Sequence, residues 1–258
     1  MELICNDLVD EHSQLDEVLA ELSESQWGFA TASAGWAIRD QVSHLWFFDQ
    51  RALMALTDPG EFEDDAKQLM SSGGTEVSVG PGRTMSGREL IEAWRSDRAR
   101  LVQVARGVDA STRIPWYGPA MGARSFITAR LMETWAHGQD VYDALGVTRE
   151  ATERLRHVAH IGVRARPFSY AIRQMELPDD DVYVALTTPS GDTATWGLPT
   201  AADSVRGPML DFCLVVTQRR HRADTALDIS GPAAEEWMAI AQAFAGAPGP
   251  GRTPGQFG

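Results

Sequence analysis

The stretch LMETWAHGQD carries three ionisable side chains at helical spacing. Glu133 and His137 are four residues apart and Asp140 follows three residues later, so in a helix they share one side with Arg130. Such a stripe is often no more than the solvated face of a helix. Here, however, apolar residues occupy the same side of the segment, namely Phe126, Ala129 and Ala144. The helix is therefore apolar nearly all round, which indicates that its polar groups face an interior.

A histidine far upstream lies in an apolar setting. His44 belongs to SHLWFFDQ and is followed directly by four apolar residues, which cover a whole helical turn. Such a turn is buried on most sides, and a buried imidazole without a partner costs on the order of 1–3 kcal/mol. Taken alone, His44 is most simply a core histidine that donates to a backbone carbonyl.

Together, His44, Glu133 and His137 form a set of two imidazoles and one carboxylate. These donors suit zinc, nickel or ferrous iron, and three protein ligands leave a coordination position open for water or substrate. The HExxH signature of many zinc enzymes is absent. Spacing alone therefore leaves two interpretations open, a metal site and an ordinary Glu–His pair on a helix.

Other polar residues are candidates for supporting roles. Asp49 and Asp140 are acceptors for the N–H groups of metal-bound imidazoles in our interpretation, and Asp49 falls on the apolar side of its predicted helix, where it needs a partner. His12 follows two acidic residues and is expected at the surface. His157 and His160 lack a nearby carboxylate or cysteine, so we expect them on a solvated helix.

One basic cluster stands out in the acidic chain: Arg219, Arg220, His221 and Arg222. It is interpreted either as a charged helix end that stabilises its own C-terminus or as a functional group. A guanidinium holds a carboxylate bidentately and stays charged at any working pH. In the functional interpretation, at least one of the three arginines is catalytic: it reaches toward the metal and holds a substrate carboxylate.

Composition limits the classes of function. The chain has 258 residues, of which 43% are hydrophobic, enough for a packed core in one or two domains. Its net charge of -13 disfavours binding to nucleic acid or to membrane surfaces. No segment predicts a leader peptide or a membrane span, and Cys5 and Cys213 form no CxxC pair. We therefore expect a cytoplasmic protein, monomer or homodimer, with two buried cysteines and a small-molecule substrate.

The first part of the chain predicts a helical bundle. Four helices are expected, at residues 2–24, 36–56, 86–106 and 125–145. Ser86 and Glu89 match a capping box at the start of the third, and Gly146 suits a left-handed cap after the fourth. Between the second and third helices, the turn at Pro59 and the glycines and serines that follow predict a loop.

The second part predicts a small α+β unit. A helical stretch from about Thr148 comes first. The later elements are expected as strands at 181–186 and 193–196, a helix at 210–216, a strand at 227–229 and a helix at 233–244. The glycine- and proline-rich end is expected to be a flexible tail. The fold class is thus α+β, with domains at 1–147 and 148–246 and a tail at 247–258.

The runs WAIRDQVSHLWFFD and RLMETWAHGQDVYDALG resemble the DinB-like metal-binding superfamily. More narrowly, they are similar to its branch that includes the mycothiol-dependent maleylpyruvate isomerases. The resemblance implies a four-helix bundle with a histidine ligand on the second helix and a Glu-x-x-x-His pair on the last, around a divalent metal, usually zinc. By that match the ligands here are His44, Glu133 and His137.

The resemblance has further implications. The second domain is expected to have a sterol-carrier-like fold and to contribute an arginine, although the match does not select among the three arginines of the basic cluster. The stretches PWYGP, GPMLDFCLVVTQRRHRAD and AQAFAG resemble an actinobacterial subgroup described only as metal-binding. The resemblance therefore implies a metal, most simply zinc, and mycothiol as a second cofactor, without fixing the reaction.

Three functions remain open from sequence. The first is a metal-dependent enzyme of the isomerase or thiol S-transferase type, in which a mycothiol thiolate adds to a small electrophilic, carboxylate-bearing metabolite. The second is a thiol-independent metal enzyme, such as a hydrolase, lyase or cyclase. The third is a non-catalytic metal-binding module. Three ligands favour catalysis, because structural zinc sites are usually closed by four.

Overall fold

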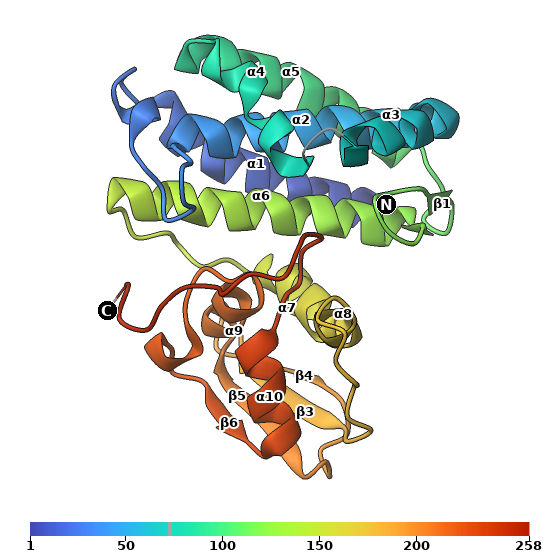
Figure 1. Ribbon diagram of the computed structural model, residues 1–258, viewed down its shortest axis with the longest axis vertical. Coiled ribbons are helices and arrows are strands. Elements are labelled where there is room, and N and C mark those ends of the chain that lie inside the picture. Colours follow the sequence, from blue (N-terminus) through green and yellow to red (C-terminus); the bar gives the residue numbers. More distant parts are fainter. Residues whose placement is uncertain (72–73, 258) are drawn as a thin grey trace. The chain divides into compact units, whose positions relative to one another are not determined.

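The computed structural model describes residues 1–71 and 74–257, and the chain divides into two compact units, Met1–Arg149 and Glu150–Gly258 (Figure 1). The first unit is helical and the second combines helices with a sheet, so the predicted α+β fold class is confirmed. The division lies close to residue 147, where the sequence places a domain boundary. That the units are separate folding domains stays a prediction.

Four long helices build the first unit: α1 (Glu2–Ala20), α2 (Ile38–Thr57), α5 (Gly87–Arg106) and α6 (Ala123–Leu145). Helix α1 packs against α5 and α6, and α2 packs against the same two helices, which closes the expected bundle (Figure 1). Apolar side chains from all four helices meet in one core that includes Leu15, Leu19, Val42, Leu45, Leu90, Trp94 and Val141. The bundle thereby holds α2 and α6 side by side.

Two predicted helix ends are confirmed. The Ser86 hydroxyl accepts from the backbone N–H of Glu89 at 3.3 Å, and the Glu89 carboxylate accepts from the backbone N–H of Ser86 at 2.8 Å. This capping box satisfies N–H groups that have no partner within α5. At the end of α6, Gly146 has φ 66°, the left-handed conformation expected of a glycine cap.

The expected loop after α2 is wrong, because helices occupy much of it. Helix α3 (Pro59–Ser71), the 3-10 turn η2 (Gly74–Ser78) and the short helix α4 (Gly80–Arg83) follow α2 directly. Pro59 stands at the start of α3, where its missing N–H costs nothing, and the Asp58 carboxylate accepts from the backbone N–H of Glu61 at 3.0 Å. Buried Phe62 and Leu69, seven residues apart, give α3 the apolar stripe that the glycines nearby obscured.

A short connection between α1 and α2 lies beside the bundle. After the 3-10 turn η1 (Gln26–Gly28), residues 30–37 form a closed loop, which we name the strap. Ala30 and Ala37 form an antiparallel bridge at its base, and the backbone N–H of Thr31 donates to the carbonyl of Trp36 at 2.8 Å. Farther along the chain, strands β1 (Arg113–Ile114) and β2 (Met121–Gly122) form a second short connection.

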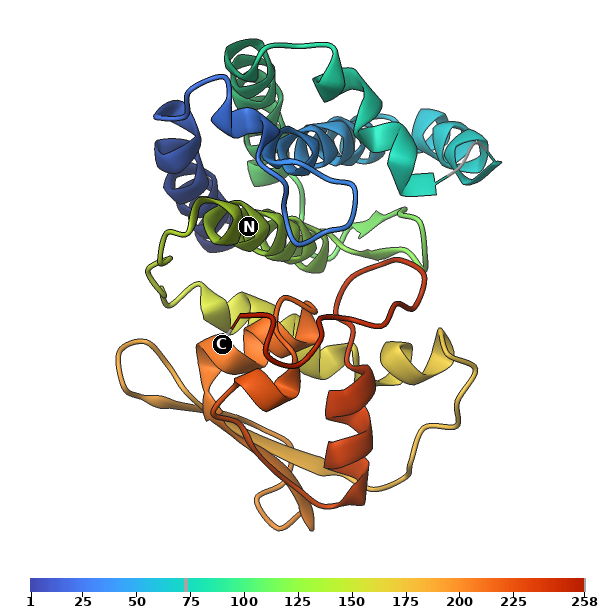
Figure 2. The same ribbon diagram turned by 60° about the vertical axis from the view of Figure 1, so that its left-hand side comes forward.

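The second unit contains a four-stranded sheet of order β4-β3-β5-β6 (Figure 2). Its strands are β3 (Val182–Thr187), β4 (Thr193–Trp196), β5 (Asp203–Pro208) and β6 (Asp228–Ser230). Strand β3 pairs antiparallel with β4, as expected, and parallel with β5. The sequence reasoning missed β5, because DSVRGP lacks the apolar alternation of a typical strand and contains glycine and proline.

Helices complete this unit: α7 (Leu155–Arg164), α8 (Arg166–Ala171), α9 (Met209–Val216) and α10 (Pro232–Ile240). Helices α9 and α10 pack against the sheet, and α10 ends four residues before the expected position 244. Near the chain end, the Phe257 ring lies 3.9 Å from the Arg220 guanidinium, and the Gly255 N–H donates to Asp224. These contacts place the chain end beside residues of its own unit, and the flexibility of the expected tail stays a prediction.

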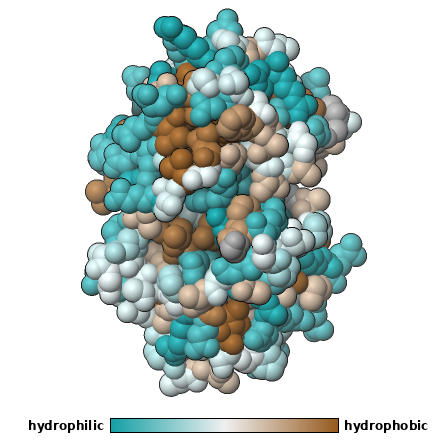
Figure 3. Space-filling model, turned by 90° about the vertical axis from the view of Figure 1, so that its left-hand side faces the viewer, coloured by the Kyte–Doolittle hydropathy of each residue, from teal (hydrophilic) through white to brown (hydrophobic). Residues whose placement is uncertain are grey.

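The surface and the cysteines agree with an acidic globular protein. Figure 3 shows a face that is largely hydrophilic, with apolar patches between polar residues, the broadest of them in the upper half of the view. Cys5 and Cys213 are buried free thiols, as expected, and burial raises the pKa of Cys213 well above the ordinary thiol value. Among the helices of the described residues, none combines the length and the apolar character that a membrane crossing requires.

Candidate metal centre

The bundle brings His44 of α2 together with Glu133 and His137 of α6. One donor atom from each side chain lies within 4.8 Å of the other two, and the ring centroids of the two histidines are 4.5 Å apart. All three residues are partly buried. Among the residues that the structure describes, no other group of three or more histidines, cysteines and carboxylates has this geometry.

The distances and the chemistry of the three donors fit a divalent metal. The Nε2 atom of His137 and the Oε2 atom of Glu133 are 3.4 Å apart. A tetrahedral centre with bonds of about 2.1 Å separates its ligand atoms by about 3.4 Å. The donor atom of His44 lies within 4.8 Å of both atoms. Two imidazoles and one carboxylate are a donor set typical of zinc sites with an open position.

The second nitrogen of each imidazole is engaged by a polar side chain. The Nδ1 atom of His137 lies 2.6 Å from Oε1 of Gln41, and the Nδ1 atom of His44 lies 2.8 Å from Oγ of Ser78. Metal-binding histidines usually have such a partner, which fixes the orientation of the ring. With both Nδ1 atoms so engaged, Nε2 is the candidate ligand nitrogen of each histidine.

Sequence reasoning missed Gln41 and Ser78. Gln41 stands three residues before His44, so helical spacing alone places it on the ligand side of α2. Ser78 gave no comparable signal, because it lies in η2, within the segment expected to be a loop. Its position against α2 depends on the fold: its backbone carbonyl accepts from the Ser43 hydroxyl at 2.8 Å.

The two predicted imidazole acceptors are both buried in the first unit, and their role beside the imidazoles stays a prediction. Asp49 is fully buried and accepts from Trp94 Nε1 at 2.8 Å and from Arg130 Nε at 3.0 Å. The expected need for a partner is therefore met by an indole and a guanidinium. Asp140 is also fully buried and accepts from the Ser33 hydroxyl at 3.3 Å, which ties the strap to α6 one turn after His137.

The expected surface position of His12 is wrong. The residue lies inside the bundle, where it is 3% exposed. Its ring meets Trp94 edge to face with the centroids 5.5 Å apart, and its Nε2 has no hydrogen-bond partner among the described residues. Burial, reinforced by the charges of Arg98 and Arg130, lowers the pKa of His12 well below 6.5. The neighbouring Glu11 is buried as well and pairs with Arg149. Adjacent acidic residues were therefore a poor guide to exposure.

Aromatic rings enclose the two histidines of the candidate metal centre. The Trp36 ring of the strap stacks on His137 at an interplanar angle of 19° and lies 5.1 Å from the His44 ring. Phe48, one turn after His44 on α2, lies 4.7 Å from the same imidazole. These contacts limit the access of water to the histidines and form apolar walls beside the site.

The basic cluster lies in the second unit. Arg219 is buried and donates to the backbone carbonyl of Thr217 at 2.6 Å, whereas Arg222 pairs with Glu235. The Arg220 guanidinium lies over the Phe257 ring.

The two histidines of α7 lie in the same unit. His157 is half-buried, and His160 is exposed, with its Nδ1 accepting from Trp196 Nε1 at 3.3 Å.

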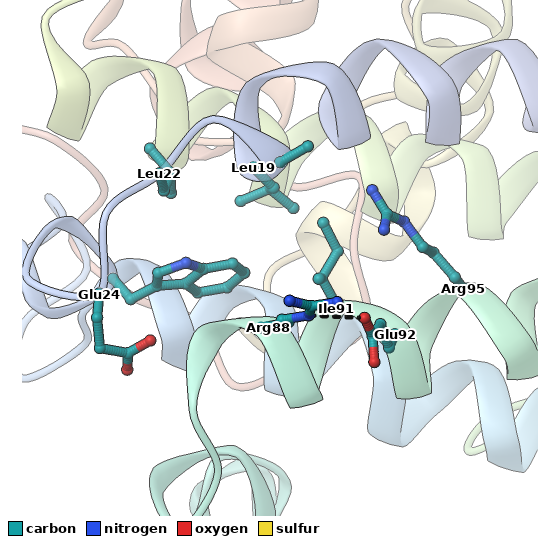
Figure 4. Close-up of a pocket in the computed structure, with 9 residues that line it drawn as sticks. Leu19, Leu22, Glu24, Arg88, Ile91, Glu92 and Arg95 are labelled. Atoms are coloured by element: carbon teal, nitrogen blue, oxygen red, sulfur yellow. Dashed lines mark hydrogen bonds and ion pairs between the residues drawn. The ribbon is translucent and has the colours of Figure 1, made fainter.

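A surface groove of about 370 Å³ lies elsewhere in the first unit, where the end of α1 and the residues after it approach α5 (Figure 4). Its lining combines apolar residues, including Leu19, Leu22 and Ile91, with charged residues at the rim. The rim charges are already paired, as in the contact of Arg88 with Glu92 at 3.1 Å. None of the three candidate metal ligands lines this groove.

Comparison with curated proteins finds relatives along nearly the whole chain. The uncharacterized protein Rv0036c of Mycobacterium tuberculosis (strain ATCC 25618 / H37Rv) is 42% identical over 248 residues, which cover 95% of this chain and 96% of that protein. The uncharacterized protein MT0041 of strain CDC 1551 / Oshkosh matches to the same extent. These relatives extend the similarity over both units.

Solved structures and a family model point in one direction. The crystal structure of the mycothiol-dependent maleylpyruvate isomerase shares the fold, with a TM-score of 0.59 at 16% identity over 89% of this chain and 92% of that one. A point mutant of that isomerase gives a TM-score of 0.58 at 15% identity, over 85% and 89% of the two chains. The model of the mycothiol maleylpyruvate isomerase N-terminal domain matches residues 8–142.

The match to the family model spans the long helices of the bundle and includes all three candidate ligands. The resemblance stated from the sequence is thereby confirmed. Membership of a family described by its isomerase identifies the protein as an enzyme. The chain belongs to the mycothiol maleylpyruvate isomerase family.

Proposed function

We propose that the protein is a divalent-metal-dependent enzyme of the mycothiol-dependent isomerase or thiol S-transferase type. Its substrate is a small electrophilic metabolite that carries a carboxylate. The observation that carries the proposal is the convergence of His44, Glu133 and His137 within 4.8 Å, inside the region that the family model matches. Zinc is the simplest occupant of this donor set.

The chain supplies the metal ligands and the apolar surroundings for this chemistry. The Nε2 atoms of His44 and His137 and the carboxylate of Glu133 hold the metal and leave a coordination position open. When bound there, the metal would lower the pKa of a cofactor thiol and hold it as thiolate. Trp36 and Phe48 limit the access of water to the imidazoles and offer an apolar surface to the substrate.

The basic cluster is proposed to hold the substrate carboxylate. At least one of Arg219, Arg220 and Arg222 takes this role, because a guanidinium binds a carboxylate bidentately and stays charged. Replacement of the functional arginine by alanine should leave metal content unchanged and weaken turnover or anion binding. Unchanged activity in all three single variants would leave the cluster with a structural role only.

Metal content is the first test. Purified or zinc-reconstituted protein should hold about one divalent ion per chain, measured by elemental analysis after dialysis. The variants His44→Ala and His137→Ala should each lose most of this metal, because two remaining ligands hold zinc poorly. A matched control is His160→Ala, which removes an exposed histidine of the other unit. Stoichiometric metal in the double variant His44→Ala/His137→Ala would refute the site.

Thiol binding is the second test. Cobalt(II) in place of zinc reports on sulfur ligation, because thiolate coordination adds a charge-transfer absorption band. We expect this band when mycothiol is added to the cobalt-loaded protein and not when it is added to the cobalt-treated double variant. Cobalt binding without a thiol-dependent band would favour a thiol-independent metal enzyme over the proposed type.

A further inference from the structure

The imidazole of His137 is held by a chain of hydrogen bonds that begins in the strap. We infer that Gln41 and Thr31 form a positioning relay that keeps His137 in its Nδ1–H tautomer, with Nε2 directed to the metal. The inference rests on the proposed function, since it concerns a ligand of the proposed metal. It assigns roles to two residues that do not themselves contact the ion.

The distances define the relay. Oε1 of Gln41 lies 2.6 Å from Nδ1 of His137, and Nε2 of the same amide donates to Oγ1 of Thr31 at 2.9 Å. The Thr31 hydroxyl then donates to the backbone carbonyl of Trp36 at 3.0 Å. Three hydrogen bonds thus connect the candidate ligand to the backbone of the strap.

The direction of the relay follows from the single proton of the threonine hydroxyl. Thr31 gives that proton to the Trp36 carbonyl, so toward Gln41 it acts as an acceptor. The Gln41 amide must then turn its NH₂ group to Thr31 and its oxygen to His137. An oxygen can only accept, so Nδ1 of His137 carries a proton. In a neutral imidazole, the lone pair is then on Nε2, the nitrogen 3.4 Å from Glu133.

The surroundings keep this arrangement in place. Gln41 is fully buried, so water does not compete for its amide. The backbone N–H of Ser33 donates to the Thr31 hydroxyl at 3.3 Å, which occupies a further acceptor position of that oxygen. The Trp36 ring, on the residue that accepts the last hydrogen bond, stacks on the His137 imidazole. The strap therefore orients the ring through both a hydrogen-bond chain and a stacking contact.

Metal affinity is the first readout. Loss of such an outer partner typically weakens metal binding by roughly 10- to 100-fold, and we expect this loss for Gln41→Leu, measured by competition with a chromophoric zinc chelator. Gln41→Glu keeps an acceptor beside Nδ1 and should restore affinity to within a few-fold of the wild type. Gln50→Leu is the matched control, because it removes a glutamine of the same helix whose amide bonds to Asp97.

Thr31 gives a second pair of variants that leaves Gln41 in place. Thr31→Val removes the acceptor that orients the amide and should weaken zinc binding roughly fivefold, in line with the loss of one hydrogen bond. Thr31→Ser retains a hydroxyl and should bind zinc like the wild type. Thermal unfolding of each variant separates this effect from a loss of fold.

The tautomer is the direct readout and needs no metal. In the metal-free protein, nitrogen-15 NMR of the histidine side chains should show His137 protonated at Nδ1 at neutral pH. In Gln41→Leu, the Nε2–H form should appear. An Nε2–H tautomer in the wild type, or zinc affinity unchanged in folded Gln41→Leu, would overturn the relay. Failure of the wild type to bind any divalent metal would instead refute the proposed function and leave the tautomer result standing.

Discussion

At the scale of single residues, the bundle interior is more polar than its apolar core suggests. His12 lies against Trp94, whose indole donates to Asp49, which in turn pairs with Arg130. Asp49 and Arg130 satisfy each other by a charge-assisted contact. His12 has no such partner for Nε2 among the described residues, so burial favours its neutral form. A neutral buried histidine makes stability depend on pH.

The first prediction concerns this histidine. Its pKa is lowered in the folded state, whereas the unfolded chain binds a proton near the ordinary value of 6.5. Below that pH the unfolded state binds more protons than the folded state. The free energy of unfolding therefore decreases as the pH is lowered, by up to about 1.4 kcal/mol per pH unit. Above it, the contribution is constant. His12→Leu removes the imidazole and should reduce the loss of unfolding free energy at acidic pH.

The measurement is urea unfolding of metal-free wild type and His12→Leu at several pH values on both sides of 6.5. The difference between the two proteins isolates His12, because the other titrating groups, including Asp16 and Arg98 beside it, are common to both. Parallel curves for the two proteins would show that His12 is protonated to the same extent in the folded and unfolded states.

Single residues also show what sequence can predict about the site. The candidate set of His44, Glu133 and His137 could be named from sequence because metal ligands are limited to a few residue types and two of the three residues share a helix face; the structure brings these side chains together. Gln41 and Ser78 contact the imidazoles through an amide and a hydroxyl, groups that are common in every protein, so residue type gives no signal. Their role depends on which segments meet in three dimensions.

At the scale of elements, helix α6, which carries two of the candidate ligands, ends at a position whose backbone conformation favours glycine. Gly146 has φ 66°, and a Cβ added there would have no heavy atom within 4 Å. The cost of replacing it is thus conformational rather than steric. The matched site is Gly107 at the end of α5, where φ is -83° and any residue fits the backbone.

The second prediction compares these two glycines. Gly146→Ala should lower the free energy of unfolding by about 1 kcal/mol, because an L-residue is strained in the left-handed region. Gly107→Ala should be neutral or stabilising by up to about 1 kcal/mol, since it restricts the unfolded chain without strain. Denaturant unfolding of both variants tests the difference. Equal effects would mean that backbone conformation does not decide the cost.

The elements that sequence missed have a common physical cause. In α3, the Pro59-Gly60 pair looks like a turn, although proline at a helix start is favourable and Phe62 and Leu69 are buried. In β5, strand pairing on both sides stabilises a segment whose residues have little intrinsic preference for a strand. Tertiary contacts overrode local preference in both. The four long helices were found because each carries apolar residues at helical spacing over several turns.

At the scale of the whole molecule, every residue of the candidate metal centre belongs to the first unit. The candidate ligands, Gln41, Ser78 and the strap all lie within Met1–Arg149. The last residue of that unit is anchored in it: Arg149 is buried, donates to the Trp135 carbonyl at 2.6 Å and pairs with buried Glu11. The unit therefore ends at a structural contact, two residues after the boundary at 147 expected from sequence.

We expect residues 1–149, expressed alone, to fold cooperatively and to bind zinc with an affinity close to that of the whole chain. Removal of Arg149 takes away one partner of a buried ion pair, a change that costs about 3–5 kcal/mol. A fragment that ends at residue 147, or the longer fragment with Arg149→Leu, should therefore unfold at lower urea concentration. The Leu variant keeps the length constant and so separates the effect of the ion pair from that of the two extra residues.

Equal stability of all three fragments would show that Arg149 does not anchor the unit. If fragment 1–149 is folded yet binds no zinc, while the whole chain does, the second unit contributes to the metal site. The assignment of the whole metal centre to the first unit would then be wrong.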